Sequence, residues 1–304
     1  MNIVLVTGAA GAIGQHLVRR LAGNGSRVIG LGHGAAPEGL PLADWINGEI
    51  EASNLKALAA RQSRPDAVIH LAGGSTVGPS LTAPAEDFAR TVATSVRLLE
   101  WVRQEAPEAA VVLTSSAAVY GNAIQLPIPE TAPRAPLSPY GCHKMMMELA
   151  GESFARNFGL RVASVRLFSV YGPGVHKQLV WELCARLSGG AQTLSLGGTG
   201  AETRDWVHIE TAAAMLASAV ALASPQAPAL NGATGRATSI AAVAKAILSG
   251  FGAEADIRFT GETRLGDPVH LVGQPSAVLQ VPPPVDALAG IAATAAAARA
   301  LLKG

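Results

Sequence analysis

Short, continuous runs of apolar residues recur along the first half of the chain. They are rich in β-branched residues and do not alternate with polar ones, so each predicts a strand buried on both faces. These runs are Ile3–Thr7, Arg27–Leu31, Ala67–Leu71, Ala109–Ser115 and Arg161–Phe168. Segments with helical spacing separate them, at Ile13–Ala22, Leu55–Arg61, Glu86–Gln104 and Tyr140–Phe158. This alternation predicts an α/β fold with a doubly wound parallel sheet.

The pattern changes after Gly172-Pro173-Gly174. Helical spacing is found at Gln178–Leu187, Glu210–Ala223, Ile240–Leu248 and Ala287–Leu302, and long turn-rich segments lie between these stretches. We therefore expect residues 1–172, with a returning segment near 200–224, to form the sheet domain. Residues 173–304 are expected to form mainly a smaller C-terminal α/β lobe.

Composition narrows the class of protein. Of 304 residues, 49% are hydrophobic and 15% are charged, which excludes a disordered chain. The net charge of +1 provides no basic field for nucleic acid or for an anionic membrane. The two cysteines form no CxxC motif, and Met1–Thr7 lacks the basic start of a signal peptide. We expect a cytoplasmic protein with no nucleic-acid or membrane partner, and the seven histidines show no metal-ligand spacing.

A glycine-rich turn follows the first predicted strand. Gly8, Gly11 and Gly14 lie between Ile3–Thr7 and Ile13–Ala22, where backbone N–H groups at a helix start can bind a pyrophosphate. Gly8 would form the turn, Gly11 would admit the phosphate, and Gly14 would allow close packing of helix on strand. The turn therefore predicts dinucleotide binding by a Rossmann domain, with Ala10, Ala12 and Ile13 also beside the cofactor.

The end of the second strand bears on the choice of cofactor. An acidic residue there usually binds a ribose 2′-hydroxyl, but this chain has Gly32 at that position. The absence of an acidic side chain permits NADP, which we slightly favour over NAD. His33 is the only candidate partner for the 2′-phosphate. Glu49 and Ile50, farther along, are candidates to flank the adenine.

A tyrosine and a lysine share one helix face. Tyr140 and Lys144 are four residues apart, so both side chains can reach one site. We expect the Lys144 ammonium, together with an oxidised nicotinamide, to lower the pKa of the Tyr140 phenol. Thr114, Ser115 and Ser116 end the predicted fourth strand, where a hydroxyl can hold a substrate oxygen.

Together these segments resemble a known family. The runs TGAAGAIG, DAVIHLAG, SSAAVYG, YGCHK, RLFSVYGPG and RDWVHI are similar to the extended short-chain dehydrogenase/reductase superfamily. The similarity is narrower to its NAD-dependent epimerase/dehydratase branch, which modifies nucleotide sugars.

The resemblance implies roles for individual residues. Ser116 would be the catalytic hydroxyl, Tyr140 the acid/base and Lys144 its partner. Leu71, Ala72, Gly73, Thr114, Ser115 and Phe168 would line the cofactor with the glycine turn, Gly32, His33, Glu49 and Ile50. Ser75, Thr76, Ser116, Tyr140, Ser169, Arg204 and Arg264 would contact the substrate, with the two arginines on its diphosphate. Relatives also imply a homodimer formed through the helices Glu86–Gln104 and Tyr140–Phe158.

Departures from the family pattern bear on the reaction. Dehydratases have an Asp-Glu pair at the serine position, whereas Ser116 is followed here by Ala117-Ala118, so dehydration is not expected. Ser169 and Thr91 replace asparagines that are typical of 4-epimerases. These changes and Gly32 favour hydride transfer to C4 of a nucleotide-linked 4-keto sugar, with Tyr140 protonating the product. A 4-epimerase with tightly bound NAD is the alternative. A non-catalytic NAD(P)-binding regulator is a remote one, because Ser116, Tyr140 and Lys144 are all present.

Overall fold

The computed structural model describes residues 2–60, 64–74, 76–262, 268–283 and 285–303. Its largest sheet has seven strands in the order β10-β6-β5-β4-β1-β2-β3, and every neighbouring pair is parallel. The strands are β1 (Ile3–Thr7), β2 (Arg27–Gly32), β3 (Asp44–Asn47), β4 (Ala67–His70), β5 (Ala110–Ser116), β6 (Arg161–Leu167) and β10 (Ala229–Gly232). The order reverses between β1 and β4, which is where open α/β sheets bind their ligands. The predicted doubly wound Rossmann-type fold is confirmed.

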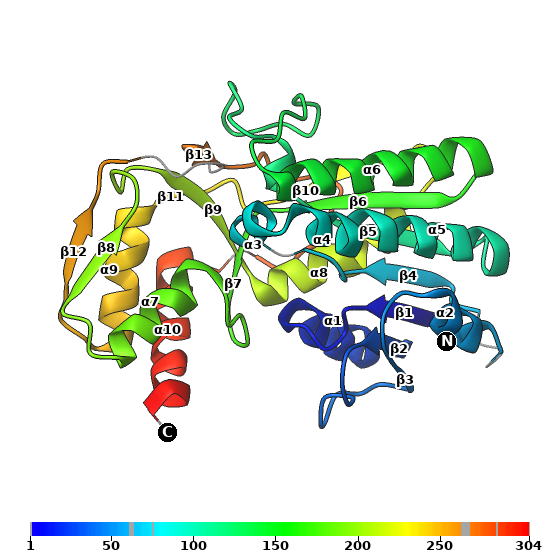
Figure 1. Ribbon diagram of the computed structural model, residues 1–304, viewed down its shortest axis with the longest axis horizontal. Coiled ribbons are helices and arrows are strands. Elements are labelled where there is room, and N and C mark those ends of the chain that lie inside the picture. Colours follow the sequence, from blue (N-terminus) through cyan, green and yellow to red (C-terminus); the bar gives the residue numbers. More distant parts are fainter. Residues whose placement is uncertain (1, 61–63, 75, 263–267, 284, 304) are drawn as a thin grey trace.

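Helices cover both faces of this sheet, as Figure 1 shows. One face packs against α1 (Ala12–Gly23) and α8 (Ile209–Ala219), and the other against α2 (Ala52–Ala60), α5 (Thr94–Glu105) and α6 (Pro139–Phe158). Successive strand residues point to opposite faces. Val4 and Val6 therefore lie in the first core, and Leu5 lies in the second. Because both faces are covered, the strands read as continuous apolar runs.

The helix expected over Glu86–Gln104 is interrupted. It consists of α4 (Pro84–Phe88), a π-helical segment Ala89–Ala93 and α5, and a short α3 (Val77–Thr82) precedes it. The π turn adds one residue to the helical repeat and so rotates α5 relative to α4. Phe88, Val92, Val96 and Leu99 recur three or four residues apart in this segment. Val92 and Leu99 are buried, whereas Phe88 and Val96 are 42% and 39% exposed.

The remaining elements form a smaller lobe, which lies to the left of the main sheet in Figure 1. One sheet joins β7 (Ser169–Tyr171), β9 (Thr203–His208), β11 (Ala237–Ser239) and β13 (His270–Leu271), and a second pairs β8 (Thr193–Leu196) with β12 (Asp256–Phe259). Helices α7 (Gln178–Ser188), α9 (Ile240–Phe251) and α10 (Ala287–Lys303) pack into a third core with Trp206. Two 3-10 turns, Ala117–Val119 and Val220–Leu222, follow β5 and α8.

The strands of this lobe, β3 and β10 were not predicted individually, because they are short and paired with distant segments. In the described part of the chain, no helix is long and apolar enough to span a bilayer. Nor do three or more His, Cys, Asp or Glu side chains there gather in a way that could hold a metal ion.

Candidate active site

The glycine turn connects β1 to α1 and has the geometry of an anion-binding loop. Gly8 has a φ of +70°, and a Cβ on it would lie 2.9 Å from the Ala72 nitrogen. A Cβ on Gly14 would lie 2.3 Å from the Gly8 carbonyl oxygen, so only glycine permits this packing. Gly11 is the N-cap of α1, no side chain caps the helix, and its first turn contains no acidic residue. The N–H groups at the start of α1 therefore fit a pyrophosphate.

A buried histidine ties the strand ends beside this turn together. Ser95 donates to the Thr91 carbonyl at 2.5 Å, so its oxygen accepts from His70 Nε2 at 2.9 Å. His70 Nδ1 then accepts from the Thr7 hydroxyl at 2.7 Å. Burial lowers the pKa of His70 from 6.5 to about 3, and the positive charge of Lys144 is the second, smaller cause. His70 therefore serves as a neutral link between β1, β4 and α5.

The other expected cofactor residues lie along the same carboxyl edge of the sheet. Ala10, Ala12 and Ile13 belong to the glycine turn and the start of α1, Leu71, Ala72 and Gly73 follow β4, and Thr114 and Ser115 end β5. Thr114 Oγ1 is buried without a hydrogen-bond partner among the described residues. Because buried hydroxyls are normally paired, this oxygen fits a ligand group at the strand end. The glycine turn and Thr114 together suit a dinucleotide.

Tyr140, Lys144 and Ser116 are brought together by α6 and β5. Ser138 caps α6 by accepting from the Gly141 nitrogen at 3.2 Å, and the Tyr140 nitrogen donates to Ser80 Oγ at 3.0 Å. The Tyr140 hydroxyl hydrogen-bonds with Ser116. Lys144 Nζ donates to the Thr114 carbonyl at 2.9 Å and lies 5.9 Å from the centre of the Tyr140 ring.

Burial dominates the electrostatics of this group. Burial raises the pKa of Tyr140, Ser116 lowers it through a hydrogen bond, and the Asp87 charge raises it again. Burial also lowers the pKa of Lys144 to about 8, against the charges of Asp87 and Glu148. Lys144 is not among the causes of the Tyr140 pKa shift, and its ammonium is directed at the Thr114 carbonyl. The protein's own groups thus raise the Tyr140 pKa through burial, and the expected lowering, which also requires an oxidised nicotinamide, stays a prediction.

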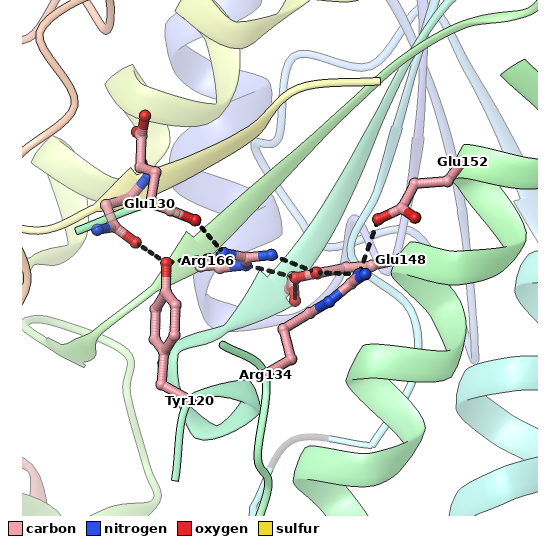
Figure 2. A network of polar contacts seen from close by, with 8 residues as sticks. Tyr120, Glu130, Arg134, Glu148, Glu152 and Arg166 are labelled. Atoms are coloured by element: carbon pink, nitrogen blue, oxygen red, sulfur yellow. Dashed lines mark hydrogen bonds and ion pairs between the residues drawn. The ribbon is translucent and has the colours of Figure 1, made fainter. Parts of the chain in front are cut away.

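A buried network of ion pairs and hydrogen bonds connects α6 with β5 and β6 (Figure 2). Glu148 accepts from Arg166 Nε and Nη2 at 2.9 and 2.7 Å, and from Ser115 Oγ at 2.5 Å. Arg134 also donates to Glu148, at 3.2 Å. Arg166 Nη1 donates to the Tyr120 hydroxyl at 2.8 Å. The network therefore fixes α6 against the ends of β5 and β6.

The Tyr120 end of the network reaches β10 and the segment that follows β13. Its hydroxyl donates to Asn231 Oδ1 at 2.7 Å. Asn231 Nδ2 in turn donates to the carbonyls of Ile128 and Gln274 at 2.9 and 3.1 Å. Backbone segments near 128 and 274 are thus attached to the same polar core.

A second buried pair lies beside the tyrosine and the lysine. His143 Nδ1 donates to Asp87 Oδ2 at 2.5 Å, and the Phe88 ring meets the imidazole edge-on at 5.6 Å. A Cβ on Gly74 would lie 1.9 Å from Asp87 Oδ1, so glycine is required there. Gly74 also donates its N–H to Thr91 Oγ1 at 2.8 Å, which joins the loop after β4 to the π-helical segment.

Other expected residues lie at the margins of this site. Gly32 ends β2, the exposed side chains of His33 and Glu49 are 3.5 Å apart, and Ile50 is buried in the second core. Phe168 is buried between β6 and β7, and a Cβ on Gly273 would lie 2.5 Å from its Cζ atom.

The expected substrate residues are spread more widely. Ser169 is half-buried and opens β7, and Thr76 directly precedes α3. Arg204 Nη1 donates to the carbonyls of Thr203 and Val269, at 2.9 and 3.1 Å. Ser75 and Arg264 lie outside the described residues.

Sequence reasoning missed several side chains of this site. Glu148 had a usable signal, because residues 140, 144 and 148 repeat at four-residue spacing along one helix face. Arg166, Asp87 and Ser80 gave no such signal, because their partners are at least 18 residues away in the sequence.

Comparison with known proteins places the chain in a family. The family model described as "NAD dependent epimerase/dehydratase family" matches residues 4–231. A UDP-glucose 4-epimerase of Azospirillum brasilense is 31% identical over 297 residues, which are 88% of this chain and 83% of that protein. A UDP-glucose 4-epimerase of Streptococcus mutans is 35% identical over 176 residues, which are 56% of this chain and 52% of that protein.

Solved structures agree over nearly the whole chain. MoeE5 in complex with UDP-glucose and NAD aligns with a TM-score of 0.86 at 30% identity, covering 98% of this chain and 99% of that chain. A UDP-glucose 4-epimerase of Thermotoga maritima, solved with UDP-glucose, aligns with a TM-score of 0.85 at 26% identity, covering 99% of both chains. This chain belongs to the NAD-dependent epimerase/dehydratase family, whose members are enzymes of the short-chain dehydrogenase/reductase type.

Proposed function

We propose that this protein inverts the configuration at C4 of a UDP-linked hexose, with NAD as a cofactor that ends each cycle in its starting state. The observation that carries the proposal is the grouping of the half-buried Ser116 and Tyr140 with the buried Lys144 at the carboxyl edge of the sheet, beside a loop suited to a dinucleotide. The names of the similar proteins, UDP-glucose 4-epimerases among them, support the epimerase alternative better than the reductase expected from the sequence.

Ser116 is followed by two alanines of the 3-10 turn, so no carboxylate of that turn is available to remove a hydroxyl group from the sugar. This supports epimerisation over dehydration. Tyr140 takes the proton of the C4 hydroxyl and returns it to the same oxygen after the sugar has presented its other face. Ser116 holds the Tyr140 oxygen in place and supplies a second hydrogen-bonding group for O4.

Lys144 contributes through its fixed position. Its ammonium is held by the Thr114 carbonyl, where it can also reach a ribose hydroxyl near the end of β5. NAD, when bound, supplies the hydride acceptor and donor and, in its oxidised form, a positive charge that favours the Tyr140 phenolate. Since burial keeps the pKa of Tyr140 above its ordinary value, the tyrosine stays protonated until such a charge is present.

The cofactor is proposed to be NAD rather than the slightly favoured NADP. A 2′-phosphate at the end of β2 would lie near His33, whose imidazole Nε2 is 3.5 Å from the Glu49 carboxylate. No lysine or arginine occurs between Arg27 and Lys56, and Arg27 is at the opposite end of β2. A 2′-phosphate would thus gain no cationic partner from this segment. The NAD bound to MoeE5 supports the same choice.

The cofactor is proposed to bind residues 1–172 together with the returning segment near 200–224, and the sugar nucleotide to bind mainly residues 173–304. Packing of α8 against α1 supports the assignment of the returning segment.

The cysteines bear on the location of the protein. The free thiols of Cys142, which is half-buried, and Cys184, which is buried, support a cytoplasmic location.

A homodimer is proposed through α5 and α6. Exposed apolar side chains lie on these helices, with Val96 on α5 and Met146 and Leu149 on one side of α6, each 39–44% exposed. A two-fold dimer buries the same patch of both subunits. Light scattering should give twice the chain mass, and Leu149→Glu should give a monomer. Val278→Glu, at an exposed valine outside these helices, is the control. A monomeric parent would contradict the proposal.

The enzymatic proposal is tested with purified protein and UDP-glucose, UDP-glucuronic acid or UDP-N-acetylglucosamine. We expect interconversion of at least one 4-epimer pair without net consumption of added NADH or NADPH. Tyr140→Phe should lower kcat by about 10²–10⁴-fold, the usual contribution of a general acid/base. Cys142→Ser, on the same helix, should keep parental activity. Stoichiometric NADPH oxidation with a 4-keto sugar and no interconversion would establish the reductase instead.

A further inference from the structure

The carboxyl end of β2 lies directly beside the glycine turn. Gly8 donates its N–H to the Leu31 carbonyl at 2.8 Å, and Thr7 is in register with Leu31. Gly32, which follows Leu31 and ends β2, is therefore the first residue of β2 past the level of the glycine turn. A nucleoside that extends from the pyrophosphate toward β2 has to pass over this position. In most dinucleotide-binding folds an Asp or Glu stands there and binds the ribose 2′-hydroxyl.

Trp45, on the neighbouring strand β3, fills the space that side chains on β2 would occupy. Gly30 is in register with Trp45. A Cβ on Gly30 would lie 2.8 Å from the indole Cε3, and a Cβ on Gly32 would lie 2.9 Å from the indole Cη2. The ring therefore extends along β2 from position 30 to position 32. No acidic side chain can be accommodated at Gly32 while the indole keeps this place.

The indole is held in this orientation by the turn after β2. Trp45 Nε1 donates to the Gly34 carbonyl at 3.0 Å, and Asn47 Oδ1 accepts from the Gly34 nitrogen at 2.8 Å. Trp45 also packs, half-buried, against the first core. Two hydrogen bonds and one packed edge thus fix a flat aromatic surface where the carboxylate would otherwise be.

We propose that the indole of Trp45 is the surface on which the adenosine ribose of NAD lies, in place of the missing acid. Recognition at this end is then by contact with an aromatic ring rather than by a hydrogen bond to the 2′-hydroxyl. This inference rests on the proposed use of NAD and adds a residue that determines how the cofactor is recognised.

The first test needs no variant. NAD and its 2′-deoxyadenosine analogue are titrated into the parent protein, and both dissociation constants are measured by calorimetry. Because no carboxylate binds the 2′-hydroxyl, we expect the two constants to differ by less than about threefold. A preference of tenfold or more for NAD would overturn the proposal, since such a difference requires a hydrogen-bonding partner at that hydroxyl.

The second test exchanges the two modes of recognition. Trp45→Ala should weaken NAD about tenfold, which corresponds to about 1.4 kcal/mol. Gly32→Asp alone should also weaken NAD, because its Cβ meets the indole. The double variant Gly32→Asp/Trp45→Ala should regain NAD affinity and prefer NAD over the 2′-deoxy analogue about tenfold. Trp45→Ala binding NAD as tightly as the parent would overturn the proposal.

A folding control separates binding from stability. Trp45→Phe keeps an aromatic ring but loses the hydrogen bond to the Gly34 carbonyl, so it should bind NAD within about threefold of the parent. Each variant is first checked by urea unfolding. If the parent binds neither NAD nor NADP, the proposed function is refuted. If the parent binds NAD and Trp45→Ala does not weaken that binding, only the role of Trp45 is refuted.

Discussion

Acidification should unfold this protein through His70. The imidazole is buried between β1, β4 and α5, and Nδ1 accepts from the Thr7 hydroxyl. Protonation would place an N–H on Nδ1, facing a hydroxyl hydrogen, in a site where no carboxylate hydrogen-bonds with the ring. Its pKa is lowered to about 3, below the 6.5 of an unfolded chain, mainly because burial opposes the charge.

The magnitude is set by the two pKa values. Between pH 6.5 and about pH 3 the unfolded chain binds a proton that the folded chain does not, so the unfolding free energy falls as the pH falls. The full effect, reached below pH 3, is about 5 kcal/mol, and by pH 5 it is about 2 kcal/mol. The unfolding free energy of native proteins is about 5–15 kcal/mol, so this loss is a large fraction of the total stability.

Urea unfolding at pH 8 and pH 5, followed by circular dichroism, measures the effect. The parent should lose about 2 kcal/mol more between these values than His70→Asn, which has no group to titrate there. His33→Asn, at an exposed histidine, should behave as the parent does. Equal losses in the parent and in His70→Asn would refute the reasoning, because the folded state would then accommodate the charged ring.

Two further predictions concern the buried network and the glycine turn. Glu148→Ala should lower the unfolding free energy by about 3–5 kcal/mol in urea titrations, because it leaves the buried Arg166 without its paired carboxylate. The control is Glu152→Ala, at a half-buried residue of the same network. An equal loss of stability in this control would argue against the special role of the Glu148 carboxylate. Gly14→Ala should destabilise by about 1–3 kcal/mol and weaken NAD at least about tenfold in calorimetry, because its Cβ meets the turn backbone. Gly23→Ala, in the same helix with open space around it, should do neither.

Local patterns predicted the features that depend on nearby residues. The apolar runs predicted β1 and β5 within one residue, and the glycine spacing predicted a strand, a turn and a helix start. The four-residue spacing of Tyr140 and Lys144 placed both on one face of α6. Each of these depends on backbone geometry within one or two turns of chain, and for this reason the fold class and the shared helix face of Tyr140 and Lys144 could be predicted.

Contacts between distant segments were beyond the reach of such patterns. Nothing near Gly32 in the sequence indicated that Trp45 would fill the missing acid's place, and nothing near His143 indicated Asp87 as its partner. Nor did the sequence indicate that burial would raise the pKa of Tyr140 in the protein alone.

The sequence by itself therefore determined the parallel sheet, the dinucleotide turn and the tyrosine–lysine face, because hydrophobic period, glycine conformation and helix spacing act locally. Only the tertiary structure decided the placement of the Trp45 indole beside Gly32, the ion pairs around Glu148 next to Ser115, and the pKa shifts of Tyr140 and Lys144. Those depend on which side chains the packed sheet excludes from water and which distant partners it brings within hydrogen-bonding distance.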